Sequence, residues 1–335
     1  MMKRIGVICP SEIAFRRFLP ALLECDGFEY AGVAVASSDE FVGATDKVLA
    51  IEKEKAQTFV DNYGGKIYES YNSLVHSTDV DAIYLPLPPA LHHQWASAAV
   101  ASGKHILVEK PCTTVLSDTE MLLHAASQRG LATHENYMFT FHAQLEAINQ
   151  IVRSGEIGEV RLYRIAFGFP RRAQNDFRYN KTLGGGALLD CGGYTLKYAS
   201  LLLGPTASIR YAQRNYIDGF DVDMYGSAAL VNDEGITAQV AFGMDQNYKC
   251  ELEVWGSKGT IYTNRIFTAP TSLIPEVVIR KGNDEQHHPL PTDNAFAKSI
   301  LHFLHCMDDA SVRTANYQTI LQQAKLVEEF KQIAR

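Results

Sequence analysis

The sequence predicts an α/β protein of two domains, and three observations carry this prediction. In the first third of the chain, short apolar runs alternate with segments of helical spacing, which is typical of a parallel sheet with helical crossovers. From about residue 145, apolar and polar residues alternate between turn signals, which is typical of an open antiparallel sheet. The length of 335 residues also exceeds what one core of ordinary size accommodates. We therefore expect a doubly wound parallel sheet over residues 1–131 and an α+β domain with an open, mainly antiparallel sheet over residues 132–335.

Strands of the first domain are expected where apolar runs are short, over residues 4–8, 30–36, 82–87, 105–108 and 132–135. Apolar residues recur at helical spacing between them, over residues 14–24, 48–63, 91–102 and 118–128. Strands joined by helices of this length pair in parallel, with right-handed crossovers. A ligand is therefore expected at the carboxyl ends of these strands.

Strands of the second domain are expected over residues 160–169, 207–216, 227–232, 236–242, 248–255, 259–263 and 276–281. Helices are expected over residues 143–153, 187–203, 294–307 and 317–333. Helices are needed on only one side of such a sheet. Its other face is expected to carry Val240, Phe242, Leu252 and Val254, which is too much apolar surface to leave in water. We therefore expect a homodimer or homotetramer that assembles through this face.

Composition excludes several classes of protein. The formal net charge is −7, so nucleic acid, whose phosphates require a basic surface, is not an expected partner. No segment approaches the roughly 20 apolar residues of a membrane span, and the apolar run at residues 5–8 is too short for a signal peptide. The six cysteines form no CxxC pair, and the histidines, with His287-His288 in an expected polar turn, show no metal-binding spacing. We expect a cytoplasmic enzyme with reduced thiols and no metal.

The turn after the first strand is the expected phosphate-binding position of the sheet. It reads Cys9-Pro10-Ser11-Glu12-Ile13-Ala14 and lacks the first two glycines of the G-x-G-x-x-G pattern. Ser11 is small and carries a hydroxyl, and the N–H groups at the start of the helix still suit an anion. On this segment alone, a cofactor-binding loop and an ordinary strand-to-helix turn stay equally open.

The end of the second strand indicates which dinucleotide is bound. An NAD site usually places Asp or Glu there to bind the ribose 2′-hydroxyl, whereas this sequence has Ser37 and Ser38, with Asp39 and Glu40 just beyond. Without a carboxylate directly at the strand end, repulsion of a 2′-phosphate is reduced. We expect NADP, with NAD as the alternative. The interpretation that the serines only cap the next helix also stays open.

Two further strand ends are expected to line the ligand crevice. Pro86 and Pro88 close the third strand, and Glu109-Lys110-Pro111 follows the fourth. A lysine at a carboxyl strand end lies where α/β sheets bind ligands. Considered alone, Lys110 is better interpreted as an ordinary solvated lysine, and only its combination with other motifs changes that.

Together these motifs resemble the Gfo/Idh/MocA family of glucose–fructose-oxidoreductase-like and inositol-dehydrogenase-like enzymes. The similarity covers nearly the whole chain in the right order. The matching segments are Ile5-Gly6-Val7-Ile8, Ile13-Ala14, Leu19-Pro20-Ala21, Glu109-Lys110-Pro111, Gly184-Gly185-Gly186-Ala187-Leu188-Leu189-Asp190-Cys191-Gly192-Gly193-Tyr194 and Gly256-Ser257-Lys258-Gly259. The resemblance implies a Rossmann domain followed by an open-sheet domain, with the substrate between them.

The resemblance also implies a catalytic set of Lys110, Asp190 and Tyr194. Lys110 corresponds to the family lysine that contacts the reacting hydroxyl or carbonyl, often beside a cis peptide to its proline. Asp190 corresponds to the aspartate at the start of the catalytic helix, and Tyr194 occupies a position where inositol-dehydrogenase-like members have histidine. A spacing of four residues puts Asp190 and Tyr194 on one helix face. Hydride addition to a carbonyl builds alkoxide charge, which a phenol can protonate and an ammonium can stabilise.

Residues 12–21 look most like the nucleotide-deoxysugar 3-ketoreductase branch of the family. This implies an NADP-dependent oxidoreductase acting on CH–OH and C=O groups, with a nucleotide-linked keto sugar as the expected substrate. A sugar, polyol or dihydrodiol dehydrogenase and a non-catalytic nucleotide-binding regulator of the same fold stay open as alternatives. Arg178 is expected to bind the diphosphate, because a guanidinium suits phosphate oxygens. A solvated arginine at an edge is the alternative.

The expected cofactor-binding residues gather in the first loop and at the strand ends: Cys9, Pro10, Ser11, Glu12, Ile13, Ser37, Ser38, Pro86, Leu87, Pro88, His92, Glu109 and Lys110. The expected substrate-binding residues, for a small-molecule sugar, are Lys110, Tyr137, Phe167, Arg178, Asp190 and Tyr194.

Overall fold

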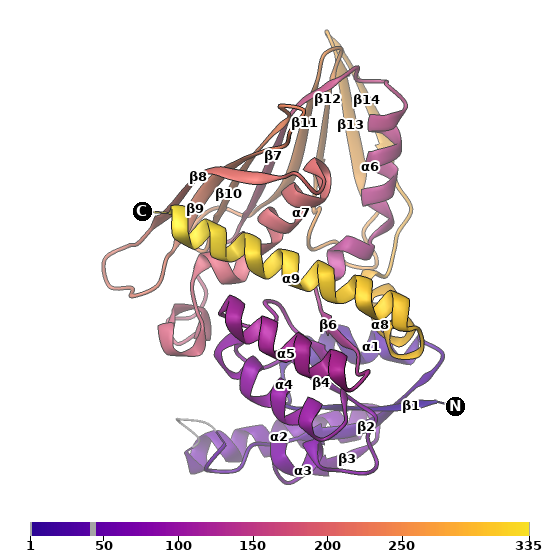
Figure 1. Cartoon of the computed structure of the whole chain (residues 1–335), viewed down its shortest axis with the longest axis vertical. Coiled ribbons are helices and arrows are strands. Elements are labelled where there is room, and N and C mark those ends of the chain that lie inside the picture. The colour runs from indigo at the N-terminus through magenta and orange to yellow at the C-terminus, as the bar shows by residue number, and fades with distance from the viewer. Residues whose placement is uncertain (1, 41–44, 335) are drawn as a thin grey trace. The chain divides into compact units, whose positions relative to one another are not determined.

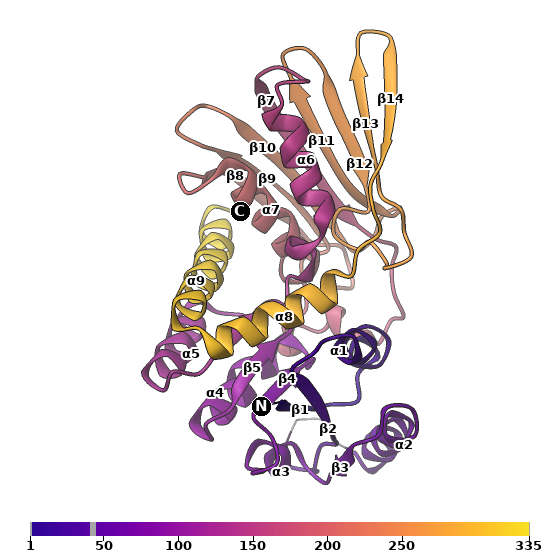
Figure 2. The same ribbon diagram turned by 90° about the vertical axis from the view of Figure 1, so that its right-hand side faces the viewer.

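The structure, a computed structural model, describes residues 2–40 and 45–334. The chain divides into two compact units (Figures 1 and 2). The first unit comprises Met1–Asn136 and Phe296–Leu321, and the second comprises Tyr137–Ala295 and Gln322–Arg335. The division differs from the single boundary expected between residues 131 and 132, since a C-terminal segment returns to the first unit. Local periodicity shows that a segment is helical, but it does not show which distant element the helix packs against.

The first unit contains a six-stranded parallel sheet in the order β3-β2-β1-β4-β5-β6. Its strands are β1 (Lys3–Val7), β2 (Phe28–Ala34), β3 (Lys66–Tyr68), β4 (Ala82–Leu85), β5 (His105–Val108) and β6 (Thr133–Glu135). The predicted doubly wound sheet is confirmed; the sequence missed β3, because three residues are too few to show a period. The strand order reverses between β1 and β4, so the carboxyl ends of these two strands flank the crevice where such sheets bind ligands.

Helices separate most of the consecutive strands, as the apolar spacing predicts. They are a π-helix η1 (Ala14–Phe18) that continues as α1 (Leu19–Leu23), α2 (Asp46–Tyr63), α3 (Tyr71–Val75), α4 (His92–Ala101) and α5 (Leu116–Gln128), with most of α8 (Ala295–Asp308) and the first part of α9 (Ala310–Ile333). Phe18 of η1 stacks on Tyr84 of β4 with ring centroids 3.9 Å apart. Both rings are fully buried, so this contact anchors the first helix over the middle of the sheet.

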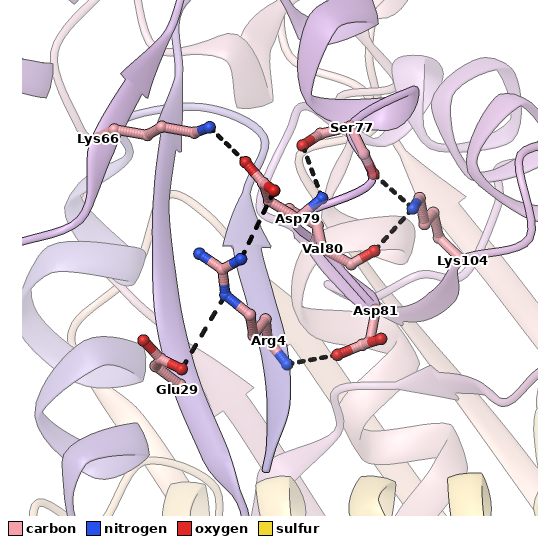
Figure 3. A network of polar contacts seen from close by, with 8 residues as sticks. All are labelled: Arg4, Glu29, Lys66, Ser77, Asp79, Val80, Asp81 and Lys104. Carbon is pink, nitrogen blue, oxygen red and sulfur yellow. Dashed lines mark hydrogen bonds and ion pairs between the residues drawn. The ribbon is translucent and has the colours of Figure 1, made fainter. Parts of the chain in front are cut away.

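Charged side chains join the amino ends of the parallel strands (Figure 3). Asp79, just before β4, pairs with Lys66 of β3 at 2.6 Å and with Arg4 of β1 at 3.8 Å. The Lys104 ammonium, just before β5, donates to the backbone carbonyls of Ser77 and Val80 at 2.6 and 2.7 Å. This edge of the sheet lies opposite the ligand crevice, so these contacts serve to hold the strands together.

The second unit contains an eight-stranded sheet in the order β14-β13-β12-β11-β7-β10-β9-β8. Its strands are β7 (Val160–Gly168), β8 (Ser208–Asn215), β9 (Tyr225–Val231), β10 (Thr237–Gly243), β11 (Lys249–Gly256), β12 (Thr260–Asn264), β13 (Glu276–Lys281) and β14 (Asp284–Pro289). β7 and β10 pair in parallel and the other neighbours are antiparallel, which confirms the predicted open, mainly antiparallel sheet. His287-His288 lies in the edge strand β14 rather than in a turn, because a polar edge strand lacks the apolar alternation that marks strands.

Helices cover one face of this sheet (Figure 2): α6 (Ala143–Arg153), a π-helix η6 (Leu188–Gly192) that continues as α7 (Gly193–Leu203), and the last part of α9. The side chains of Val240, Phe242, Leu252 and Val254 are at most 3% exposed and belong to the core on this covered face. The expectation that they form the uncovered face is therefore wrong. Successive side chains alternate along a strand, so the uncovered face carries their chain neighbours instead.

Within residues 2–40 and 45–334, no helix combines the length and the apolar character that crossing a membrane requires.

Candidate functional site

The loop after β1 forms without the usual glycines because Ser11 caps the helix that follows. The Ser11 hydroxyl oxygen accepts from the N–H of Ala14 at 3.2 Å, and the Ser11 N–H donates to the Cys9 carbonyl at 2.8 Å. The Cys9 thiol donates to the carbonyl of Pro86 at 3.7 Å, which joins this loop to the end of β4. Burial, and after it the charge of Glu52, raises the pKa of the Cys9 thiol. Cys9 is thus a neutral packing residue of the loop.

The same loop offers donors to a pyrophosphate. The start of a helix leaves its first N–H groups without an acceptor four residues earlier, and the exposed residues Glu12 and Ile13 stand at that start. Pro10 is buried and supplies no N–H. The residues of this loop therefore fit an anion, with fewer backbone donors than a glycine-rich loop supplies.

The end of β2 is shaped by carboxylates. The Ser37 hydroxyl donates to Asp39 Oδ1 at 2.7 Å, and the Ser37 N–H donates to Glu40 Oε2 at 2.8 Å. Ser38 is exposed. The following helix, α2, is capped by Thr45, whose hydroxyl accepts a hydrogen bond from the N–H three residues on. The interpretation of the two serines as the cap of that helix is therefore wrong.

His92 ties the end of β4 to the segment after β5. Its Nδ1 lies 2.8 Å from the carbonyl oxygen of Pro111, and its Nε2 lies 2.8 Å from that of Leu87. The side chain is fully buried, and burial lowers the pKa of the imidazole. Backbone carbonyl oxygens lie against both ring nitrogens, so His92 positions these two segments. Its expected contact with the cofactor stays a prediction. The other expected residues at this strand end are the buried Pro86 and the half-buried Pro88.

Glu109 is held by neutral donors. The hydroxyl of Tyr84 donates to its Oε1 at 2.7 Å, and Asn136 Nδ2 donates to the same oxygen at 2.6 Å. Burial raises the pKa of Glu109, and these two hydrogen bonds oppose that rise. The half-buried Lys110 follows directly and is joined to Pro111 by a cis peptide bond. The two hydrogen bonds therefore fix the backbone that carries Lys110.

Asn136 is a site residue that the sequence did not indicate. It links Glu109 to the C-terminal helices, because its Oδ1 accepts from the hydroxyl of Ser299 on α8 at 2.8 Å. Ser299 lies 163 residues further along the chain, and no motif connects the two positions. The sequence carried no signal that could have found this network.

Asp190 forms a half-buried ion pair with Arg178. Arg178 Nε donates to Asp190 Oδ2 at 2.7 Å, and its Nη1 donates to Asp176 Oδ1 at 3.1 Å. Burial alone lowers the pKa of the guanidinium, but the two carboxylates outweigh that effect and raise it. Two carboxylates already pair with Arg178, and its expected contact with a diphosphate stays a prediction. Arg178 positions Asp190, and an ion-paired carboxylate accepts hydrogen bonds rather than donating a proton.

The glycine-rich segment before Asp190 is required by close packing. Gly186 has a φ of +119°, and a Cβ there would lie 2.5 Å from Asp223 Oδ1. Asp223 in turn accepts from the N–H of Leu188 at 2.7 Å, which holds the first turn of η6. A side chain at position 186 would displace the start of the helix that carries Asp190.

Tyr194 lies in the first turn of α7 among aromatic rings. Tyr137 and Phe167 meet it edge-on, with ring centroids 5.1 and 5.2 Å away. Tyr137 is 1% exposed and its hydroxyl accepts from Gln323 Nε2 at 3.4 Å. Tyr137 and Phe167 are buried and pack against the Tyr194 ring. Their expected contact with substrate stays a prediction. Tyr194 itself is 8% exposed.

Both helices expected to carry function begin with π-helical turns, η1 and η6. Such turns are frequent at functional sites. Asp190 belongs to η6 and Tyr194 to α7. The one-face argument for these two residues assumed a regular α-helix, and the π-helical turn between them changes the spacing on which it depends. Across the described ranges, no group of three or more His, Cys, Asp or Glu side chains is placed to hold a metal ion.

A doubly wound sheet with anion donors at its switch point, and a lysine at a neighbouring strand end, defines a dinucleotide-binding oxidoreductase. The chain belongs to the Gfo/Idh/MocA oxidoreductase family. The model of the family's NAD-binding Rossmann fold matches residues 15–137, and the model of its C-terminal domain matches residues 145–262.

Proteins with known activities match over nearly the full length. The chain is 36% identical, over 99% of its length and 96% of the relative, to a dTDP-3,4-didehydro-2,6-dideoxy-α-D-glucose 3-reductase from Actinomadura kijaniata. It is 35% identical to the enzyme of the same name from Saccharopolyspora spinosa, over 99% and 97% of the two chains. It also superimposes with a TM-score of 0.89, at 35% identity and covering 100% and 98% of the chains, on a 3-ketoreductase from Actinomadura kijaniata in complex with NADP and TDP-benzene.

Proposed function

We propose that this protein is an NADP-dependent ketoreductase that reduces the 3-keto group of a dTDP-linked deoxysugar. The observation that carries the proposal is the match to 3-reductases over the full length of the chain. The chain also retains a lysine at the end of β5 and a tyrosine at the start of α7. These two side chains supply the charge and the proton that carbonyl reduction needs.

The roles of the residues follow from their chemistry. A bound nicotinamide dinucleotide supplies or accepts the hydride. The Tyr194 phenol donates a proton to the oxygen of the carbonyl as it is reduced, and the Lys110 ammonium stabilises the negative charge on that oxygen. Asp190, held by Arg178, is an acceptor that orients a sugar hydroxyl. The helix start at Glu12 and Ile13 binds the pyrophosphate, and the strand end at Ser37 and Ser38 lies toward the adenosine ribose.

Turnover of a dTDP-linked 3-keto-2,6-dideoxysugar with NADPH tests the proposal. Tyr194→Phe removes the proton donor but keeps the ring, so turnover should fall roughly 10²- to 10⁴-fold. Lys110→Ala should lower turnover by a comparable factor. NADPH binding, followed by the fluorescence of Trp95, should persist in Tyr194→Phe.

Tyr198→Phe is the matched control for the tyrosine. Tyr198 lies one turn further along α7, is 2% exposed, and its hydroxyl has no hydrogen-bond partner among the described atoms. Its loss should leave turnover unchanged. Near-normal turnover in both Tyr194→Phe and Lys110→Ala would overturn the assignment of the catalytic residues. Binding of NADPH without turnover of any keto sugar would instead favour a regulator.

We also propose that the protein is a homodimer built through the uncovered face of the second unit's sheet. This face has a hollow of about 840 Å³ lined by residues of β7, β9, β10 and β11. Tyr211 and Trp255, 52% and 40% exposed, lie on β8 and β11, and Arg164 pairs with Glu253 on this face at 3.2 Å. Light scattering that gave the 37.2 kDa of one chain would overturn the dimer. Trp255→Glu should dissociate it.

We also propose that the protein is located in the cytoplasm. The six cysteines are all free thiols, and reduced thiols are what the cytoplasm maintains.

A further inference from the structure

A carboxylate reaches the end of β2 from helix α2. Glu52 Oε2 accepts from the N–H of Ala36 at 2.9 Å, and Glu52 Oε1 lies 3.4 Å from the hydroxyl of Tyr71. Ala36 stands directly before Ser37 at this strand end. The sequence shows no acidic residue at that position, yet the fold supplies one from 16 residues further along.

Glu52 also lies close to the first loop. Its charge contributes to the raised pKa of the Cys9 thiol, second only to burial. Cys9 follows β1 and Ala36 follows β2, which are neighbouring strands. The carboxylate is bonded at the end of β2 and acts electrostatically on the end of β1. In a doubly wound sheet, the ribose next to the pyrophosphate lies at this place.

The other carboxylate at this strand end, that of Glu40, is bonded to backbone N–H groups of the protein. It accepts from the N–H groups of Ser37, Tyr71 and Asn72 at 2.8, 2.9 and 2.7 Å, and it is 8% exposed. Three backbone donors offset its charge. Glu52 has one backbone donor and one long contact with a phenol, and its residue is half-buried. Burial raises the pKa of Glu52, and the hydrogen bonds from Ala36 and Tyr71 and the charge of Lys55 oppose that rise. A carboxylate can accept about four hydrogen bonds, so Glu52 keeps acceptor capacity for a ligand.

We propose that Glu52 sets the preference of this protein between NADP and NAD. Its carboxylate accepts from a ribose 2′-hydroxyl and repels a 2′-phosphate, so it lowers the affinity for NADP relative to NAD. The inference rests on the proposed function, because it requires a dinucleotide in the first unit. On this proposal, a residue of helix α2, and not Ser37 and Ser38 at the strand end, sets the preference between NADP and NAD.

Glu52→Gln tests this inference, because glutamine can still accept from the Ala36 N–H while it carries no charge. Dissociation constants for NADPH and NADH are measured by tryptophan fluorescence, with no substrate present. The ratio of NADPH affinity to NADH affinity should rise about five- to tenfold, the size that Coulomb's law gives for neighbouring charges in a solvated site. The rise should shrink at high salt. The same measurement with 2′-phospho-ADP-ribose and ADP-ribose should give the same change, since both lack nicotinamide.

Glu54→Gln is the matched control: it removes the same charge from the same helix, at an exposed position. An equal rise in both variants, or no rise in Glu52→Gln, would overturn the inference and leave the proposed function standing. A change for the dinucleotides but not for the fragments would also overturn it. If the unmodified protein bound neither dinucleotide, the proposed function would fall, and the inference with it.

Discussion

The two edges of the parallel sheet in the first unit differ in how their charged side chains are paired. At the amino edge, Asp79 meets Lys66 and Arg4, and all three side chains are 39% to 53% exposed. At the carboxyl edge, Glu40 is buried and Glu52 and Glu109 are half-buried. Their carboxylates are bonded to backbone N–H groups, hydroxyls or an amide.

The difference indicates that charged residues at the amino edge have a structural role and that those at the carboxyl edge have a functional one. Ion pairs between exposed side chains contribute little to the free energy of unfolding. Buried carboxylates with neutral donors cost desolvation free energy, and a fold retains them where a ligand or a precise local geometry is needed. The Arg178–Asp190 pair in the second unit is half-buried, and Asp190 is itself a residue expected to act in catalysis.

Among substitutions at the two edges, we expect Glu109→Ala to lower the stability of the protein most. Glu109→Ala leaves the hydroxyl of the buried Tyr84 and the amide of the buried Asn136 without their acceptor. We expect the free energy of unfolding to fall by about 2–3 kcal/mol, as measured by urea denaturation. Glu109→Gln, which retains an acceptor, should lose less. Equal stability of the Ala variant and the unmodified protein would show that these hydrogen bonds contribute nothing.

A smaller effect concerns His105, the first residue of β5 at the amino edge. Burial, with the charges of Lys3 and Arg313, lowers its pKa from 6.5 to about 4. Below pH 6.5 the unfolded chain therefore takes up a proton that the folded chain does not, so stability falls as the pH falls from about 7 to about 4. We expect this group to contribute about 1–2 kcal/mol, less than the full linkage value because the ring is partly exposed.

His105→Asn isolates this contribution. The imidazole Nδ1 accepts from the N–H of Ala132 at 2.9 Å, and an asparagine oxygen can take over that role. The stability–pH curve of the variant should be flatter than that of the unmodified protein between pH 4 and 7. Parallel curves would contradict the prediction.

The smallest effect is expected at Asp79. Asp79→Ala removes the pairs with Lys66 and Arg4, which are exposed and screened by salt. The midpoint of thermal unfolding should drop by only about 1–2 °C, and the difference should vanish in molar salt. A loss as large as that of Glu109→Ala would mean that the two edges do not differ in the way described.

Local sequence patterns predicted most of the helices and strands. A few particular residues show which features such patterns do not predict. The strand over residues 105–108 and the helix over residues 143–153 have the predicted bounds. The short β3 and the polar β14 carry no apolar period, so they were missed. The motifs at Lys110 and Tyr194 lie on the expected strand end and helix. His92 and Arg178, both expected to contact ligands, form hydrogen bonds and ion pairs within the protein that no local pattern indicates.

By itself, the sequence determined the order of strands and helices, the doubly wound class of the first sheet and the family, because these depend on periodicity and on contiguous motifs. Tertiary structure decided which face of the second sheet is buried, since a shift of one residue exchanges the faces of a strand. It also decided that Phe296–Leu321 joins the first unit and that Asn136 and Ser299 support Glu109. It brought Glu52 from α2 to the end of β2. These outcomes depend on contacts between residues far apart in the chain, and no local pattern records which distant partner a side chain meets.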